Sequence, residues 1–372
     1  MSIDHSAMHG QLLLLGVPGT ELTAADAELY RKIQPAGFVL FGRNVVSPEQ
    51  VRKLTDDLRE VCDITPIISI DQEGGRVSRT REIGTEPPSA QELREKNDPG
   101  LIAKHGMITA DVLRLLGFNM NLCPVLDISY DDEADNAMKG RCYGTDAQQV
   151  ITNAGIFNSN LRHRKILSSG KHFPSCGLAD TDPHHDLPHV DKSLAEMLAT
   201  DLLPYTALMP QLDSLMSCHA HFSAIDGETP GLPGSLSHNL LTKILRLQLG
   251  YEGVIMTDDL DMGAIVNTYG RGPDVKLAIE AGNDLAMICH QVDTAPTALE
   301  HLKQLSTGIV DDSLRRIEKL KKRLINPFIF TMEKWQSLDE ETMQLRIDVL
   351  GEELAKQTQD YSDEKRSPVE GY

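Results

Sequence analysis

The stretch GVIMTDD, residues 253–259, is an apolar run that ends in two carboxylates. A continuous apolar run of this length, rather than an alternating one, is typical of a strand buried on both faces of a parallel sheet. Seven comparable runs lie along the chain, at residues 12–16, 37–42, 66–71, 118–125, 166–173, 214–220 and 285–290. The sequence therefore predicts eight buried parallel strands.

The intervals between these runs carry the signals of helices. In SPEQVRKLTDDLREV, Ser47 is a predicted N-cap, Pro48 takes the first helical position, and Gln50 is predicted to complete a capping box. Eight strands alternating with helices favour a (β/α)8 barrel over an open doubly wound sheet, and no GxGxxG motif follows the first run. We expect an α/β fold: a single (β/α)8 catalytic barrel over residues 1–330, then a C-terminal helix and polar tail over 331–372.

Composition restricts the classes of partner. The chain has 372 residues, 40% of them hydrophobic, which is enough for a large core. Its formal net charge of −19 argues against nucleic acid or an anionic membrane as a partner. No export signal opens the sequence, no apolar run is long enough to cross a bilayer, and the six cysteines form no CxxC pair. We therefore expect a cytoplasmic protein that is a monomer or a weak homo-oligomer.

Ionisable residues stand at the ends of several predicted strands. In (β/α)8 barrels, functional side chains gather at the carboxyl ends of strands and in the loops that follow. The residues at these ends are Asp71, Lys171, His172, His219, Asp258 and Asp259. An aspartate after a strand is often only a turn former or a helix N-cap, whereas a buried lysine needs an anionic or hydroxyl partner. Their arrangement predicts a functional site at one rim of the barrel.

Several motifs surround this predicted rim. They are DQEGGRVSR at 71–79, GKHFP at 170–174, DPH at 182–184, MTDDLDMGAI at 256–265 and AGNDLAMICH at 281–290. Together they resemble the β-N-acetylhexosaminidase branch of glycoside hydrolase family 3, over roughly residues 10–325. The resemblance implies a (β/α)8 barrel without the second sandwich domain of many relatives.

The resemblance also implies roles for individual residues. Asp258 matches the catalytic nucleophile, His184 the general acid/base, and Asp182 the carboxylate that supports this histidine. The positions that match binding sites for the sugar hydroxyls and the acetamido group are Asp71, Arg79, Arg141, Lys171 and His172. No cofactor and no metal is implied. The expected partner is a small carbohydrate with terminal β-linked N-acetylglucosamine, such as a muropeptide from cell-wall recycling.

These residue types suit a retaining glycosidase. Such an enzyme needs a carboxylate that attacks the anomeric carbon and a proton donor for the leaving oxygen. An imidazole with an ordinary pKa near ~6.5 can donate and recover a proton close to neutral pH. Asp182 can orient the His184 ring, as the aspartate of a catalytic triad does.

One departure from the family pattern lies just before the predicted acid/base. Where relatives commonly read KHFPGHG, this chain reads KHFPSCG, so Ser175 and Cys176 replace a glycine and a histidine. The three proposed catalytic residues lie outside this change. In the loop that follows, His185, Asp186 and His189 are interpreted as polar loop residues.

Other functions remain open at this point. CHAH at 218–221 places His219 and His221 on one face of a strand, so a metal-dependent hydrolase is one alternative, with further ligands from the loop histidines His184, His185 and His189. A sugar-binding barrel without turnover is another. Within the enzyme hypothesis, a histidine in place of a carboxylate repels phosphate less, so phosphorolysis is a third alternative.

Overall fold

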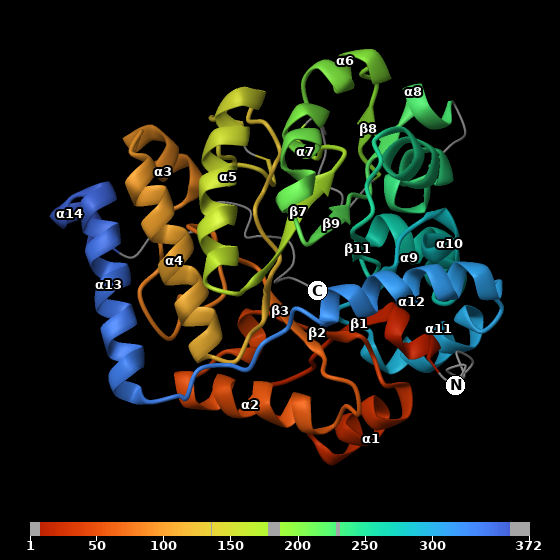
Figure 1. Ribbon diagram of the computed structural model, residues 1–372, viewed down its shortest axis with the longest axis horizontal. Helices are drawn as coiled ribbons and strands as arrows, with labels where there is room; N and C mark the ends of the chain where they lie inside the picture. The colour runs from red at the N-terminus through yellow and green to blue at the C-terminus, as the bar shows by residue number, and fades with distance from the viewer. Residues whose placement is uncertain (1–7, 135, 178–186, 228–230, 358–372) are drawn as a thin grey trace.

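The computed structural model describes residues 8–134, 136–177, 187–227 and 231–357 (Figure 1). Within these residues, eight parallel strands close into a barrel in chain order. They are β1 (Leu13–Gly16), β2 (Gly37–Leu40), β3 (Ile67–Ile70), β6 (Met120–Asn121), β7 (Leu167–Phe173), β9 (Ser214–Ser217), β11 (Val254–Asp259) and β12 (Leu285–Ile288). β1 pairs with both β2 and β12, which closes the barrel. Each predicted apolar run contains one of these strands, so the predicted fold class is confirmed.

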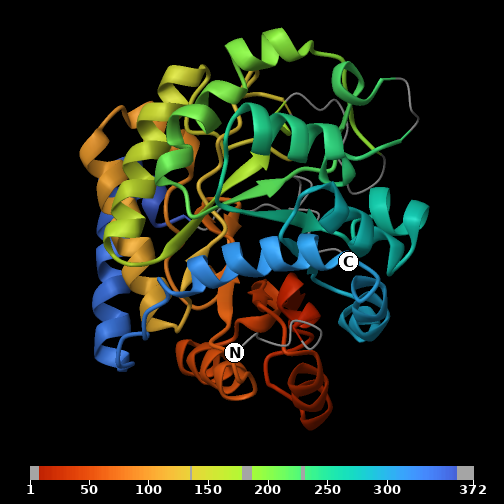
Figure 2. The same ribbon diagram turned by 45° about the vertical axis from the view of Figure 1, so that its right-hand side comes forward.

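Helices surround the barrel (Figure 2). They are α1 (Ala24–Ile33), α2 (Pro48–Glu60), α3 (Ala90–Lys96), α4 (Pro99–Leu115), α5 (Ala147–His163), α6 (Leu194–Ala199), α7 (Leu202–Leu208), α8 (Ser223–Asp226), η6 (Asn239–Gln248), α9 (Gly263–Tyr269), α10 (Pro273–Ala281), α11 (Ala295–Leu302), α12 (Thr307–Lys321), α13 (Met332–Leu350) and α14 (Glu352–Ala355). Short strands β4 (Gln72–Gly74) and β5 (Val77–Ser78) form a hairpin directly after β3. Strands β8 (His189–Val190) and β10 (His221–Phe222) form a separate parallel pair.

The start of α2 shows how local sequence sets an element. Ser47 caps the helix by accepting the backbone N–H of Gln50, and Pro48 occupies the first turn, as predicted. The capping-box prediction is wrong in one detail, because the Gln50 side chain accepts the N–H of Val46 rather than that of Ser47. Ser47 is extended, and with this backbone the N–H of Val46 is the one that meets the Gln50 side chain.

Two buried aspartates hold the amino-terminal ends of barrel strands. Asp213, just before β9, accepts the backbone N–H of Ser168 at the start of β7 and pairs with Arg162. Asp284, just before β12, accepts the N–H of Ile255 at the start of β11. Because each carboxylate satisfies a donor on a neighbouring strand, these residues lock the strands at the end opposite to the predicted site.

The helix α13 braces the segment that follows the β4–β5 hairpin. α13 lies alongside α4, at the left of Figure 1. Its Asp339 accepts the backbone N–H of Thr85 at 2.5 Å, and its Arg346 donates to the carbonyl of Glu86 at 3.0 Å. The packing is close, since a Cβ on Gly84 would lie 2.8 Å from a ring carbon of Trp335. α13 therefore fixes the path of the chain just beyond Arg79.

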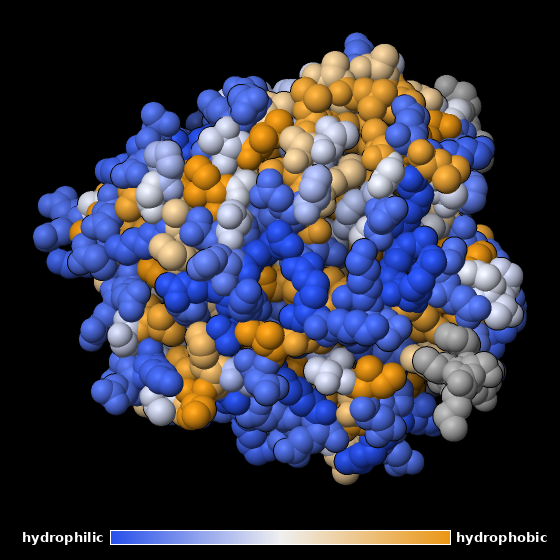
Figure 3. Space-filling view, in the orientation of Figure 1, coloured by the Kyte–Doolittle hydropathy of each residue, from blue (hydrophilic) through white to orange (hydrophobic). Residues whose placement is uncertain are grey.

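The visible surface in Figure 3 is mostly hydrophilic, with an apolar area over α6 and α7 at the top. Leu203, in α7, is 39% exposed. None of the helices that the structure describes combines the length and apolar composition needed to cross a bilayer.

Candidate active site

The carboxyl ends of three barrel strands carry four of the predicted site residues. Asp71 directly follows β3, Lys171 and His172 lie near the end of β7, and Asp258 is the penultimate residue of β11. Since all strands of the barrel are parallel, these ends meet at one rim. The structure therefore brings the four residues to the same end of the barrel.

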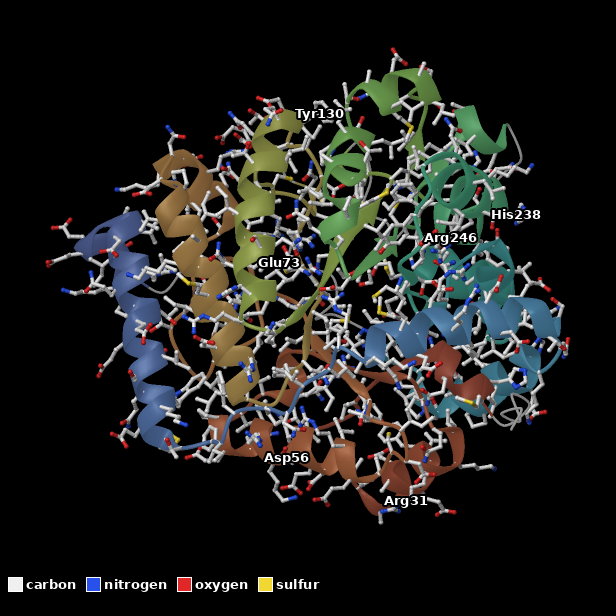
Figure 4. All side chains as sticks on the ribbon, in the orientation of Figure 1. Arg31, Asp56, Glu73, Tyr130, His238 and Arg246 are labelled. Atoms are coloured by element: carbon white, nitrogen blue, oxygen red, sulfur yellow. The ribbon has the colours of Figure 1, made fainter. Side chains whose placement is uncertain are left out.

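Lys171 is a buried cation between two carboxylates. Its side chain is 2% exposed, and its Nζ lies 2.5 Å from Asp71 Oδ1 and 2.6 Å from Glu73 Oε1. Arg141 donates from Nε and Nη2 to the two oxygens of Glu73, each at 2.8 Å. Figure 4 labels Glu73 near the middle of the molecule. Two cations thus face two carboxylates, which is the condition under which charges are tolerated away from water.

These contacts keep the buried groups ionised. Burial lowers the pKa of Lys171, but the carboxylates of Asp71 and Glu73 outweigh it and hold the pKa above its usual value. Burial likewise raises the pKa of Glu73, and the charges of Arg141 and Lys171 bring it well below the usual range. Burial lowers the pKa of Arg141, but the contacts with Glu73 and the charges of Asp71 and Asp127 together outweigh burial and raise it above its usual value. The rim therefore presents fixed charges of both signs.

His172 is held between a carboxylate and an arginine. Its Nδ1 lies 2.9 Å from Asp127 Oδ2, and its backbone N–H donates to the same oxygen at 3.1 Å. On the other side of the ring, Nε2 lies 3.5 Å from Arg141 Nη2. His172 is therefore connected through Arg141 to the cluster around Glu73.

Arg79 is buried at the end of β5, where its backbone N–H donates to the side chain of Gln72. Its guanidinium lies 5.8 Å from the centre of the Phe41 ring, and that of Arg43 lies 4.6 Å from the same centre. Phe41 directly follows β2, so Arg79 extends the rim from β3 toward the neighbouring strand.

The two aspartates of β11 have different environments. Asp258 is half-buried, and its Oδ1 accepts the N–H of Asp259 at 2.8 Å. Asp259 is buried, and its Oδ1 accepts the N–H groups of Asp261 and Cys289. Burial and the neighbouring charge of Asp261 raise the pKa of Asp259 to about 8. Asp259 therefore joins the ends of β11 and β12, and Asp258 is the one that solvent or a ligand can reach.

The predicted acid/base His184 and its support Asp182 lie outside the described residues, as do His185 and Asp186. The structure does show where the chain leaves and re-enters the described part. It leaves after Gly177, beyond the end of β7, and it returns before β8, which pairs with β10.

The HxH pair is fully engaged in hydrogen-bonding contacts. The two ring nitrogens of His219 lie 2.7 Å from Ser235 Oγ and 2.9 Å from the carbonyl oxygen of Asp259. Those of His221 lie 2.9 Å and 3.2 Å from the carbonyl oxygens of Leu232 and Gly227. Because these nitrogens already face hydrogen-bond partners, the pair is arranged for structural support rather than for metal ligation.

Comparison with known families agrees with the barrel fold. Residues 7–320 match the profile described as the glycosyl hydrolase family 3 N-terminal domain. The chain belongs to glycosyl hydrolase family 3. It is therefore a glycoside hydrolase, as the sequence motifs predict.

Curated family 3 relatives cover most of the chain. A protein named beta-hexosaminidase from Pseudomonas aeruginosa is 31% identical over 294 residues, which is 79% of this chain and 86% of that protein. Another beta-hexosaminidase, from Photobacterium profundum, is 31% identical over 341 residues, or 90% of this chain and 97% of that protein.

Solved family 3 structures share the fold. A family 3 beta-N-acetylglucosaminidase from Paenibacillus sp. str. FPU-7 superposes with a TM-score of 0.83 at 30% identity, over 93% of this chain and 68% of that one. Native NagZ from Neisseria gonorrhoeae gives a TM-score of 0.77 at 25% identity, over 90% and 97% of the two chains.

Two further carboxylates of the rim, Glu73 and Asp127, are not among the predicted site residues. Glu73 stands two positions after Asp71 in DQEGGRVSR, and this acidic pair was a signal that could have found it. Asp127 follows the apolar run 118–125 by two positions, as a rim carboxylate should. Cys176, which replaces the usual histidine, donates its backbone N–H to Asp127 Oδ1. Any residue except proline would supply this N–H, so the contact does not depend on the side chain.

Proposed function

We propose that this family 3 hydrolase is a retaining exo-β-N-acetylglucosaminidase that removes terminal β-linked N-acetylglucosamine. The observation that carries the proposal is the half-buried Asp258 at the rim that also holds the Lys171–Asp71 ion pair. The names of the relatives, beta-hexosaminidase and beta-N-acetylglucosaminidase, support this sugar specificity.

In the proposed reaction, Asp258 attacks the anomeric carbon and forms a covalent glycosyl-enzyme intermediate. The N–H of Asp259 donates to Asp258 Oδ1 and fixes the plane of the carboxylate before the attack. His184, supported by Asp182, gives a proton to the leaving oxygen and then takes one from the water that hydrolyses the intermediate. No cofactor is required by this sequence of steps.

The substrate side of the proposal assigns the charged cluster to recognition. Asp71 accepts hydrogen bonds from sugar hydroxyls, and Lys171 donates to neighbouring oxygens. His172 offers its ring nitrogen Nε2 as an acceptor beside Arg141. Arg79 and Arg141 complete the set that the family resemblance assigns to the sugar and its acetamido group. We propose a muropeptide-derived sugar as the natural substrate, in line with the resemblance of the sequence motifs.

A panel of nitrophenyl glycosides at neutral pH tests the proposal. We expect release of nitrophenol from the N-acetylglucosaminide and little from the glucoside, with the same rate in the presence and absence of phosphate. Activity on the glucoside alone would overturn the sugar assignment. Formation of a sugar phosphate would show phosphorolysis instead of hydrolysis.

A further inference from the structure

One buried carboxylate, that of Asp127, touches both the sugar-binding strand and the start of the segment that leads to the predicted acid/base. Asp127 is 1% exposed. Its Oδ2 accepts the backbone N–H and the Nδ1 side of His172, and its Oδ1 accepts the N–H groups of Cys176 at 2.6 Å and Gly177 at 3.3 Å. One carboxylate oxygen of Asp127 therefore holds His172, and the other holds the chain at Cys176 and Gly177.

The contacts of the His172 ring determine which nitrogen carries the proton. A guanidinium can only donate hydrogen bonds, so Arg141 Nη2 requires an acceptor at His172 Nε2. Nδ1 then carries the hydrogen and donates it to Asp127 Oδ2. Asp127 therefore selects the tautomer of His172 as well as the orientation of its ring, as an aspartate does for a catalytic histidine.

The charge of Asp127 is maintained by these same contacts. Burial raises the pKa of the Asp127 carboxyl, but the hydrogen bonds from His172 and from the N–H of Cys176 outweigh burial and hold the pKa below its usual value. An asparagine at this position would keep one acceptor oxygen and present an NH₂ group in place of the other. The NH₂ group cannot accept the His172 Nδ1 hydrogen, so the two sets of donors could no longer both be satisfied.

We propose that Asp127 is a positioning residue that couples sugar binding at His172 to the placement of the chain at Cys176 and Gly177. The coupling rests on the proposed function, since it assigns His172 to the sugar and the segment beyond Gly177 to acid/base chemistry. Asp127 is buried, and the proposal assigns it no contact with the sugar. It acts through the residues that it holds.

The first test compares Asp127→Asn with Asp213→Asn. Asp213 is a matched control, because it is a buried aspartate that accepts the N–H of Ser168 at the opposite end of the same strand, β7. We expect Asp127→Asn to lower kcat/KM by about 100-fold, between the effect of an orienting contact and that of a triad aspartate. We expect Asp213→Asn to lower Tm and to change kcat/KM by less than about twofold. Equal kcat/KM in the two variants would overturn the proposal.

The second test separates the two arms of the coupling with a double-mutant cycle. If Asp127 acted only through His172, then Asp127→Asn would have no further effect in a His172→Ala background. We expect a further loss of about tenfold there, larger for substrates with poor leaving groups, because those depend most on proton donation. No further loss would overturn the coupling to Cys176 and Gly177. The cycle uses whichever nitrophenyl glycoside the wild-type protein hydrolyses, so a wrong sugar assignment leaves this test intact.

A third measurement requires neither turnover nor a stable Asp127 variant. In wild-type protein labelled with ¹⁵N-histidine, the resonances of His172 are identified by their loss in His172→Gln. We expect Nδ1 to have the shift of a protonated nitrogen and Nε2 that of an unprotonated acceptor at neutral pH. The opposite tautomer would overturn the role assigned to Asp127, whatever the activity measurements show.

Discussion

The two ends of the barrel use the same residue types in different ways. At the amino-terminal end, Asp284 is enclosed by Arg246 and Arg316 and by the N–H of Ile255. At the carboxyl-terminal end, Asp258 is half-buried, and its Oδ1 accepts the N–H of the next residue in the chain. The same residue type is thus enclosed by cations at one end of the barrel and left partly accessible at the other, and this accessibility supports the catalytic role that we propose for Asp258.

The largest effect that would test this contrast is expected for Asp258→Ala. Because the proposed nucleophile is removed, we expect kcat to fall on the order of 10⁴-fold or more, with Tm close to that of the wild type. The measurement is hydrolysis of a nitrophenyl N-acetylglucosaminide together with thermal unfolding. Retention of more than a tenth of the activity would remove Asp258 from the proposed mechanism.

The next largest effect concerns His184, whose assignment remains a prediction. We expect His184→Ala to slow substrates with poor leaving groups by about 10²- to 10⁴-fold, and to slow nitrophenyl substrates far less, because only the former need protonation. A series of aryl glycosides with leaving groups of graded pKa provides the measurement. Equal losses across the series would exclude His184 as the acid.

At the opposite end of the barrel, Asp284→Ala should affect stability and leave catalysis unchanged. Removing one partner of a buried ion pair costs about 3–5 kcal/mol, since Arg246 and Arg316 are left without their shared carboxylate. The free energy of unfolding in urea should fall by that amount, while kcat/KM per folded molecule stays the same. A loss of kcat/KM in folded protein would break the contrast between the two ends.

The buried His105 of α4 should make the fold sensitive to acid. Burial lowers the pKa of His105 to about 4, and its ring packs 5.1 Å from that of Phe157. The unfolded chain takes up the proton near pH 6.5 and the folded one only near pH 4, so the folded state loses roughly 3 kcal/mol as the pH falls across this window. His105→Phe should flatten the fall in urea-unfolding free energy between pH 6.5 and 4. An unchanged slope would contradict this assignment.

The smallest effect is expected where α13 supports the segment that follows Arg79, through the contacts of Asp339 and Arg346 with Thr85 and Glu86. Asp339→Ala removes the acceptor for the N–H of Thr85, which is worth about 1 kcal/mol. We expect KM to rise severalfold with kcat nearly unchanged, since the brace positions a binding residue and no reacting group. Glu341→Ala, on an exposed position of the same helix, is the control and should leave KM unchanged.

The strands and the rim could be predicted because their signals are local. Buried parallel strands are continuous apolar runs, and the residue that ends a run is at the rim whatever the partners are. The partners of Lys171 could not be predicted in full, because Glu73 reaches it from a hairpin whose return path does not appear in any periodic pattern. The position of Asp127 after an apolar run places it at the rim, but its contacts could not be predicted, because its four donors come from β7 and from the chain beyond it. The Gln50 side chain was predicted to accept the N–H of Ser47, but it accepts that of Val46. The capping-box pattern does not specify the backbone conformation that decides between the two N–H groups.

The brace that α13 supplies has a consequence for the order in which the protein is made. Arg79 and the segment 80–87 leave the ribosome early, whereas Asp339 and Arg346, which hold that segment, are among the last described residues to be synthesised. During translation, the barrel strands can close before this part of the rim has its support. A nascent chain can therefore close its barrel before it contains Asp339, which lies 254 positions beyond Thr85 and supports this part of the rim.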